Sequence, residues 1–386
     1  MDLTFLLTEE CNLRCTYCYQ KNYPRSVLPV ETALSAMNAA VRHGARRLAL
    51  TFFGGEPLLQ SGALFSILRA ARTLEREKEI PVTAKVSTNG LLLDDEVIRN
   101  AAELGLFLSL SHDGIREAMD GGRVLPDGSS SFERVDGALR RLVASGIPFG
   151  VYSVITPANV RHLLRSRRYL WDAGARILVG AIDYTARWDE ASIQTLLDQY
   201  EKLADFYRTI LKEKRNAHVE PFDSRISQRT RSSSYQSCAP GVRQVTVAPD
   251  GTLYACVEYF YRRLQPIGTA ETWLDPDRVR ALSLARRAKP DECGDCALNE
   301  RCNNDCACIN LRTTGSVNLP PASLCITEQE TIRAADELAA RLYREKVPEF
   351  LMRHYSNSYH LLSSIERLLE SMGVSHEHAP AGPRSL

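Results

Sequence analysis

The sequence predicts an α/β protein: a partial (β/α)6 barrel followed by a cysteine-rich C-terminal domain and terminal helices. Short β-type runs alternate with amphipathic helical runs over residues 1–215, which is the pattern of a parallel sheet with helical crossovers. Eight of the 11 cysteines then fall within residues 237–327. The remaining segment, residues 328–386, begins with helical periodicity and ends in a polar tail.

Six runs rich in Val, Ile, Leu, Phe or Thr are the expected strands of the barrel. Strands joined in series by helices form a parallel sheet with right-handed crossovers. Six units, rather than eight, predict an open, TIM-like barrel whose chemistry lies on the loops after the strands. The expected strands are residues 3–8, 46–53, 82–87, 106–111, 149–155 and 177–181.

Amphipathic helices are expected between these strands. Residues 30–43 place Leu34, Met37 and Val41 on one face, and Gly44 follows as a stop signal. The other expected helices are residues 95–104, 132–145 and 159–173, each followed by glycine, and a long helix over residues 192–212.

The second half of the chain has a different composition. Residues 216–236 are rich in Ser and Arg and are expected to form a linker or bridge. Residues 237–327 form a second domain, with short strands near residues 244–247 and 252–256 around a Pro-Asp-Gly turn. Residues 328–386 are expected to be C-terminal helices, broken near Pro348, with a disordered tail.

Composition excludes several classes of partner. The 386 residues are 44% hydrophobic, and the net charge of +1 gives no argument for nucleic acid or for an anionic membrane surface. We find no signal peptide and no apolar run long enough to span a membrane. The cysteines are odd in number, clustered and without a secretion signal. We therefore expect a reducing cytoplasm and metal ligation by most of the thiols.

The most informative stretch is CNLRCTYCY, in which Cys11, Cys15 and Cys18 follow the first strand. Three thiolates on one loop can hold three irons of a 4Fe–4S cluster and leave the fourth iron open for a substrate or cofactor. Zinc and three ordinary buried thiols are the alternatives. Structural zinc sites usually come as two pairs of ligands, so the spacing favours the cluster.

This loop resembles the CxxxCxΦC loop of radical S-adenosylmethionine (SAM) enzymes, where Φ is aromatic. Three further segments resemble motifs of that family and follow successive strands. They are Gly54-Gly55-Glu56-Pro57, Ser87-Thr88-Asn89-Gly90 and Ser111-His112-Asp113-Gly114, the last with His112 where the family has leucine.

The resemblance implies a role for each motif. The amino and carboxylate groups of SAM would chelate the open iron. Gly54 and Gly55 would let the backbone approach SAM, and Glu56 with nearby carbonyls would accept hydrogen bonds from its ammonium. Tyr17 would lie near the adenine, and Ser111 would bind the carboxylate or ribose. The bound cofactor would then yield methionine and a 5′-deoxyadenosyl radical.

The C-terminal cysteines resemble a SPASM domain, a module that carries auxiliary Fe–S clusters. The signature is matched by Cys238, Gly251, Cys256, Cys293, Cys296, Cys302, Cys306 and Cys325. The family pattern implies one cluster on Cys293, Cys296, Cys302 and Cys325, for which a zinc ribbon is the alternative. It implies a second on Cys238, Cys256 and Cys306. Cys308 is its candidate fourth ligand; otherwise this cluster keeps an open iron.

Together the two regions resemble radical SAM/SPASM enzymes, which implies maturation of a ribosomally made precursor peptide by thioether or carbon–carbon crosslinking. An auxiliary cluster would accept the surplus electron. A flavodoxin- or ferredoxin-type electron donor is an expected partner. For the leader of the precursor peptide three alternatives stay open: a separate leader-binding protein, the C-terminal helices, or no leader binding. The alternative is an anaerobic sulfatase-maturating enzyme, but Val257 stands where that family has aspartate, leaving Glu258 or Tyr259 as candidate bases. A non-catalytic Fe–S carrier and a zinc-stabilised binding module fit the SAM motifs poorly.

Overall fold

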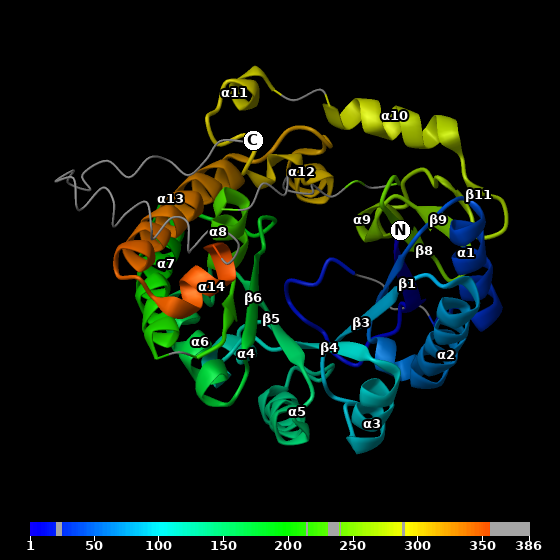
Figure 1. Ribbon diagram of the computed structural model, residues 1–386, viewed down its shortest axis with the longest axis horizontal. Helices are drawn as coiled ribbons and strands as arrows, with labels where there is room; N and C mark the ends of the chain where they lie inside the picture. The colour runs from blue at the N-terminus through cyan, green and yellow to red at the C-terminus, as the bar shows by residue number, and fades with distance from the viewer. Residues whose placement is uncertain (21–24, 214, 231–238, 240, 288–289, 356–386) are drawn as a thin grey trace.

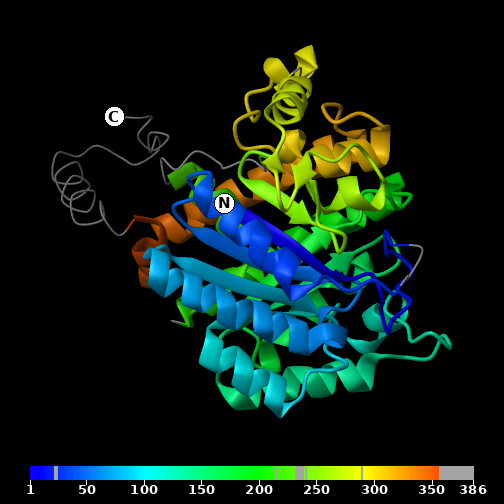
Figure 2. The same cartoon turned by 90° about the vertical axis from the view of Figure 1, so that its right-hand side faces the viewer.

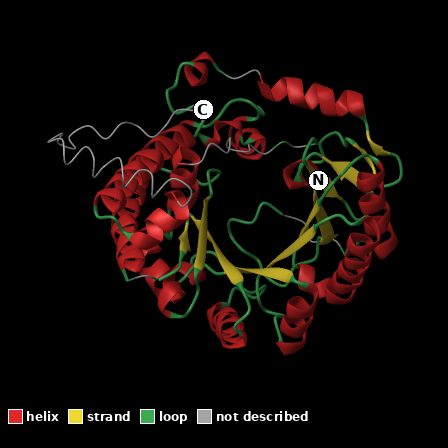
Figure 3. Ribbon diagram, viewed as in Figure 1, coloured by secondary structure: helices red, strands yellow, loops and turns green. Residues whose placement is uncertain are grey.

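A computed structural model describes residues 1–20, 25–213, 215–230, 239, 241–287 and 290–355. It confirms the α/β fold class: parallel strands curve around a common axis, and helices cover their outer side (Figures 1 and 3). Cys238, the end of the expected linker and the C-terminal tail lie outside the described residues. No helix in the described ranges is long and apolar enough to cross a membrane.

All six expected strands are present and pair in parallel, each with the next in sequence. Their alternate residues are buried against the outer helices, as shown by Leu3 and Phe5 of the first strand and Leu50 and Phe52 of the second. The other alternate residues therefore line the inner face of the barrel. The strands are β1 (Asp2–Thr8), β2 (Leu48–Gly54), β3 (Val82–Thr88), β4 (Leu106–Ser111), β5 (Phe149–Ile155) and β6 (Ile177–Ile182).

The expected crossover helices are present to within a few residues, and two helices that were not expected lie after β2 and after β4. These two are α2 (Ser61–Lys78), preceded by the short η1 (Pro57–Gln60), and α4 (Arg116–Asp120). The others are α1 (Val30–Arg42), α3 (Asp95–Leu104), α5 (Phe132–Ser145), η2 (Val160–His162), α6 (Leu163–Asp172) and α7 (Glu190–Lys212).

The described part of the segment expected to be a linker, as far as Thr230, forms regular secondary structure. It forms β7 (His218–Val219), which extends the parallel sheet beside β6, and α8 (Phe222–Thr230). Phe222 and Ile226 are fully buried, and these two apolar residues within a polar stretch are enough to anchor one short helix. The polar composition had concealed this.

The cysteine-rich region continues the same sheet. Strand β8 (Gln244–Val247) pairs in parallel with β1, so the sheet has 11 strands in the order β11-β10-β9-β8-β1-β2-β3-β4-β5-β6-β7. Figure 2 shows this region, in yellow, above the blue and cyan βα units. Its elements are β9 (Thr252–Tyr254), α9 (Val257–Tyr261), β10 (Gly268–Thr269), β11 (Trp273–Leu274), α10 (Pro276–Arg287), α11 (Asp291–Gly294), η3 (Asn303–Asp305) and α12 (Ala307–Thr314).

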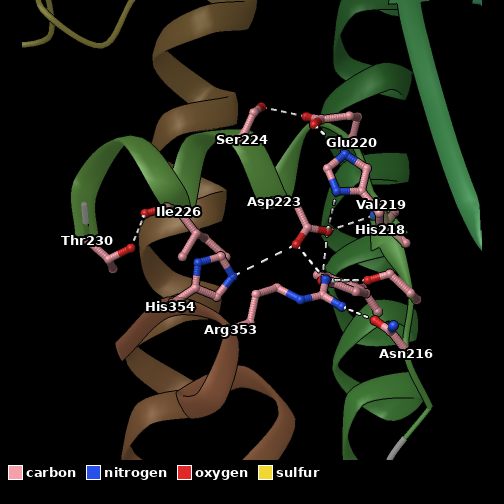
Figure 4. A network of polar contacts seen from close by, with 12 residues as sticks. Asn216, His218, Val219, Glu220, Asp223, Ser224, Ile226, Thr230, Arg353 and His354 are labelled. Carbon is pink, nitrogen blue, oxygen red and sulfur yellow. Dashed lines mark hydrogen bonds and ion pairs between the residues drawn. The ribbon is translucent and has the colours of Figure 1, made fainter. Parts of the chain in front are cut away.

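Two C-terminal helices, α13 (Ala322–Arg344) and α14 (Pro348–Tyr355), pack against α7 and α8, with the expected break before Pro348. Buried Asp223 of α8 attaches α14: it accepts hydrogen bonds from Arg353 (2.7 Å), Tyr207 (2.7 Å) and the Val219 N–H (2.7 Å) (Figure 4). One buried carboxylate thus joins β7, α7, α8 and α14.

Candidate active site

The Cys11–Cys18 loop begins directly after β1 and is held by backbone hydrogen bonds on both sides. On one side, the N–H groups of Gly55 and Glu56 donate to the carbonyls of Thr8 and Glu10, each at 2.8 Å. On the other, Arg14 and Thr16 donate to the carbonyls of Val124 and Gly122, at 2.8 and 2.9 Å. The loop is therefore placed by the segments that follow β2 and β4.

The three thiols of this loop are half-buried, and none is in a disulfide. Burial raises the pKa of Cys11 to about 11 and also raises that of Cys15. Both are thiols at neutral pH without iron, so iron binding there would release protons. No three Cys, His, Asp or Glu side chains of the described ranges converge on one point. A 4Fe–4S cluster distributes its thiolates over separate irons, and the three cysteines of this strand-end loop suit that ligand set.

Gly54 and Gly55 are required for contact between two loops. A Cβ atom on Gly54, which has φ +138°, would lie 2.1 Å from the Thr8 carbonyl oxygen, and one on Gly55 would lie 2.2 Å from that of Glu10. The space that a side chain would need is thus filled by the start of the cysteine loop. The sequence predicts that the backbone at Gly54 and Gly55 lies close to SAM. The structure shows that the same two glycines also lie against the backbone of the cysteine loop.

Replacing Gly55 by alanine is therefore expected to displace the cysteine loop. The clash is with backbone, which cannot rotate away, so we expect a loss of about 1–3 kcal/mol in unfolding free energy and fewer irons retained after reconstitution. Thermal unfolding and iron analysis measure both. The control is Gly62→Ala in α2, where a Cβ meets nothing within 4 Å; a similar loss there would contradict the explanation.

Glu56 holds the loop after β2 to the end of β3. Its buried carboxylate accepts hydrogen bonds from the Leu58 N–H (3.0 Å), the Thr88 hydroxyl (2.7 Å) and the Asn89 N–H (2.7 Å). Burial raises the pKa of Glu56, and these three donors lower it in part. Within the described residues its observed role is therefore to position the two SAM-motif segments, and Pro57 begins η1 directly after it.

Asn89 connects the third motif to the cysteine loop. Its amide donates to the side chain of Asn12 at 2.7 Å and lies 3.9 Å from the Cys11 sulfur. Ser87 and Ser111 are half-buried on the inner face, at the ends of β3 and β4. Neither side chain has a hydrogen-bond partner in the described part of the protein, so both hydroxyls are available to a ligand.

Tyr17 is fixed by Asp113 and Arg123, whose roles sequence reasoning did not predict. Its hydroxyl donates to Asp113 at 2.5 Å, and the same carboxylate accepts from Arg123 at 3.1 Å and from the Val154 N–H at 2.8 Å. Burial acts to lower the pKa of Arg123, but the Asp113 charge outweighs it and raises the pKa. Asp113 was visible in the fourth motif, whereas Arg123 carried no signal of its own.

His112, the departure from the fourth motif, lies away from the site. Its fully buried ring faces α5 and α6 on the outer side of the barrel, beside Phe132 and Tyr169. Nδ1 accepts from the Gly114 N–H at 3.0 Å, and Nε2 lies 3.8 Å from Asp136. The substitution therefore changes the packing behind the site.

Asp136 should make stability depend on acid pH. Contacts with His112, Tyr169 and Arg140 lower its pKa to about 2, below the ordinary 3.8. A carboxylate with a depressed folded-state pKa stabilises above its unfolded pKa, and this contribution is lost as pH falls from about 4 to about 2. Asp136→Asn should lower the unfolding free energy by at most about 2 kcal/mol at neutral pH. It should also make the unfolding free energy less dependent on pH between about 4 and 2. Urea unfolding at several pH values measures this, and an unchanged slope would contradict it.

The structure brings several of the C-terminal cysteines together in pairs. The sulfurs of Cys256, before α9, and Cys308, in α12, are 2.9 Å apart. Burial raises the pKa of the Cys302 thiol to about 12, and nearby Cys325 adds a smaller rise. Cys293 lies in α11, Cys296 follows that helix, and Cys306 precedes α12.

Aromatic rings join the two cysteine regions. Tyr19, next to Cys18, contacts Tyr261 of α9 with ring centroids 5.0 Å apart, and Arg312 lies 5.5 Å over the Tyr19 ring. Glu258, a candidate base, is paired with Arg262 at 2.7 Å and Arg312 at 3.6 Å. Its carboxylate therefore fixes this junction and is poorly placed to accept a substrate proton.

Comparison with known proteins agrees with these motifs. A family model described as the radical SAM superfamily matches residues 5–170. The cysteine-type anaerobic sulfatase-maturating enzyme of Clostridium perfringens is 25% identical over 44% of this chain and 47% of its own length, so the match spans less than half of that relative. The Fe-coproporphyrin III synthase of Methanosarcina barkeri is 23% identical over 84% of this chain and 87% of its own length.

Solved structures share the fold. "Native anSMEcpe with bound AdoMet" superimposes with a TM-score of 0.76 at 19% identity, over 89% of this chain and 99% of the other. The Streptococcus suis protein SuiB, bound to precursor peptide SuiA, superimposes with a TM-score of 0.61 at 16% identity, over 84% and 75%. At these identities the likeness is one of fold.

Proposed function

We propose that this chain, an enzyme of the radical SAM superfamily, modifies a ribosomally made peptide. The observation that carries the proposal is the assembly of four motifs at successive strand ends. Backbone and side-chain hydrogen bonds connect the cysteine loop to Glu56, to Asn89 and, through Tyr17, to Asp113. The likeness in fold to SuiB with its precursor peptide supports a peptide substrate.

In this proposal Cys11, Cys15 and Cys18 hold a 4Fe–4S cluster, and the bound cluster with SAM supplies the 5′-deoxyadenosyl radical. The protein's own residues bind and orient SAM. Tyr17 is set beside the loop by Asp113, while Ser87 and Ser111 present hydroxyl groups on the inner face. Glu56 keeps the loops after β2 and β3 together, so that the backbone at Gly54 and Gly55 faces the bound ligand.

The C-terminal cysteines are proposed to hold two auxiliary 4Fe–4S clusters, with Cys308 completing the one on Cys238, Cys256 and Cys306. The position of Cys308 beside Cys256 supports its membership of the same group of thiols, and binding of separate irons would move the two sulfurs apart. Because α12 begins just after Cys306, its first turn carries Cys308 back toward Cys256. The second cluster would use Cys293, Cys296, Cys302 and Cys325.

Cys308→Ala should leave this auxiliary cluster with three thiolates. The comparison is made with Cys11, Cys15 and Cys18 replaced by alanine, because the first cluster also has only three thiolates and would give the same signal. In that background we expect the missing ligand to make one iron labile, so that mild oxidation produces the electron paramagnetic resonance signal of a three-iron cluster. Ile309→Ala in the same background, one residue further along α12, is the control for disturbance of the helix. A spectrum unchanged by Cys308→Ala would show that Cys308 is not a ligand.

Sulfatase maturation is the second candidate, supported by the similarity to the Clostridium perfringens enzyme. Val257, in place of an acid, counts against it. The test is to incubate the reconstituted enzyme, SAM and reductant with the peptide encoded beside its gene, a sulfatase-derived peptide and a porphyrin. A crosslinked product lacking two hydrogens supports peptide maturation. Formylglycine supports the second candidate, and reaction with the porphyrin alone would overturn both.

A further inference from the structure

One row of side chains on the inner face of the barrel is polar across four neighbouring strands. Register pairs Thr246 of β8 with Thr4 of β1, Thr4 with Thr51 of β2, and Thr51 with Lys85 of β3. Strand partners at one level point to the same side. We name these four residues the threonine–lysine row.

None of the four has a hydrogen-bond or ion-pair partner for its side chain among the described residues. The Thr246 hydroxyl is fully buried and unpaired. Lys85 is exposed toward the inner face and makes no ion pair in the described part of the chain. A buried polar group without a partner costs free energy, and among these four residues the Thr246 hydroxyl carries that cost. The exposed ammonium of Lys85 has no counter-charge in the described part of the chain and is open to an anionic ligand.

A cavity of about 530 Å³ opens in front of three members of the row, Thr4, Thr51 and Lys85. Phe53, Phe107 and Val257 are among its apolar lining residues. The acid at its edge, Asp2, lies 3.7 Å from Arg47. The cavity therefore offers one ammonium group and several hydroxyls to a ligand.

The usual preference of β-strands for threonine explains the three threonines of the row but not its lysine. Threonine is common in strands, so three threonines alone would carry little weight. Lysine is depleted there, and β3 is a central strand whose neighbours Ala84 and Val86 are buried. A cation at this point of a barrel interior is not explained by packing.

We propose that the threonine–lysine row binds a carboxylate of the peptide substrate, with Lys85 as its cationic anchor. The inference rests on the proposed function. Lys85 lies two residues before Ser87 on the same face of β3, hence about 7 Å deeper in the barrel. A substrate residue held near the Ser87 motif could thus extend a carboxylate to the row. The favoured substrate is a peptide with an acidic side chain, or its C-terminus, at or beside the modified residue.

Three matched probes separate the two sources of carboxylate. N-acetylglutamate α-amide has only the side-chain carboxylate, N-acetylglutamine has only the α-carboxylate, and N-acetylglutamine amide has neither. Each is titrated into the reconstituted holoenzyme by calorimetry, and protection of Lys85 from reductive methylation is followed by mass spectrometry. Lys85→Met and Thr51→Val test the row. Lys78→Met, on the exposed end of α2, is the matched control.

We expect one carboxylate probe to bind and protect Lys85, while the neutral probe does neither. Lys85→Met should weaken that binding at least about tenfold, as loss of one charge-assisted hydrogen bond does. In Thr51→Val, Lys85 should be methylated normally without a probe, and the bound probe should protect it less than in wild type. Lys78→Met should match wild type in both measurements. Equal behaviour of all three probes, or an equal loss in Lys78→Met, would overturn the inference.

The same preparations are assayed for 5′-deoxyadenosine without any probe. If wild type forms 5′-deoxyadenosine but the three probes bind and protect Lys85 equally, the proposed carboxylate site is wrong and the proposed function stands. If wild type forms none with full iron content and reductant, the proposed function fails, whatever the probes show.

Discussion

Replacing Cys11, Cys15 and Cys18 together by alanine is expected to lower the iron content from about twelve to about eight per chain, the loss of one four-iron cluster. Formation of 5′-deoxyadenosine should fall to background. The reason is that these cysteines lie on the strand-end loop to which the other SAM motifs are hydrogen-bonded. Anaerobic iron and sulfide analysis, with chromatography of SAM products, measures both quantities.

The control is Thr16→Ala, an exposed side chain between Cys15 and Tyr17 without a side-chain hydrogen bond in the described residues. It should keep wild-type iron content and SAM cleavage. Circular dichroism of the triple variant shows whether the barrel is still folded. Zinc in place of iron, with no SAM cleavage by wild type, would contradict the radical SAM assignment and leave a metal-stabilised binding protein.

The Asp113→Asn substitution is expected to lower the unfolding free energy by about 3 kcal/mol, because it leaves a buried cation without its counter-charge. The guanidinium of Arg123 is 8% exposed and the Asp113 side chain is fully buried. The variant should also bind SAM more weakly, since the Tyr17 hydroxyl loses its charged acceptor. Denaturant unfolding and equilibrium binding of SAM measure the two effects.

The double variant Asp113→Asn/Arg123→Gln tests whether the loss of stability comes from an unpaired buried charge. Removing both members of a buried pair leaves no uncompensated charge, so the double variant should be more stable than the single one. SAM binding should stay weak, because the ionised acceptor for Tyr17 is still absent. A double variant less stable than Asp113→Asn alone would contradict the role given to the ion pair.

These two predictions concern different layers of one site. The cysteines are the groups proposed to touch the cofactor, and two buried carboxylates hold those groups in place. Glu56 joins the loops after β2 and β3, and Asp113, on the loop after β4, joins the cysteine loop to strand β5. A site built in this way depends on residues whose side chains need never touch SAM.

The sequence by itself determined the order of the strands and the positions of the motifs, because both are local. A strand is recognised by its run of apolar residues, and a parallel βα series places every strand end at one rim. The resemblance of CNLRCTYCY and of the three later motifs to one family was readable for the same reason, since each motif lies within a few residues.

Only the tertiary structure decided the contacts between segments far apart in the chain. Tyr17 donates a hydrogen bond to Asp113, 96 residues further along the chain, and the sulfur of Cys308 lies beside that of Cys256, 52 residues earlier. Strand β8 joins β1 across more than 230 residues of chain, which alone places Thr246 in a row with Thr4, Thr51 and Lys85. Side chains meet because strands pair and helices cross, and the identity of such partners is not contained in any local pattern.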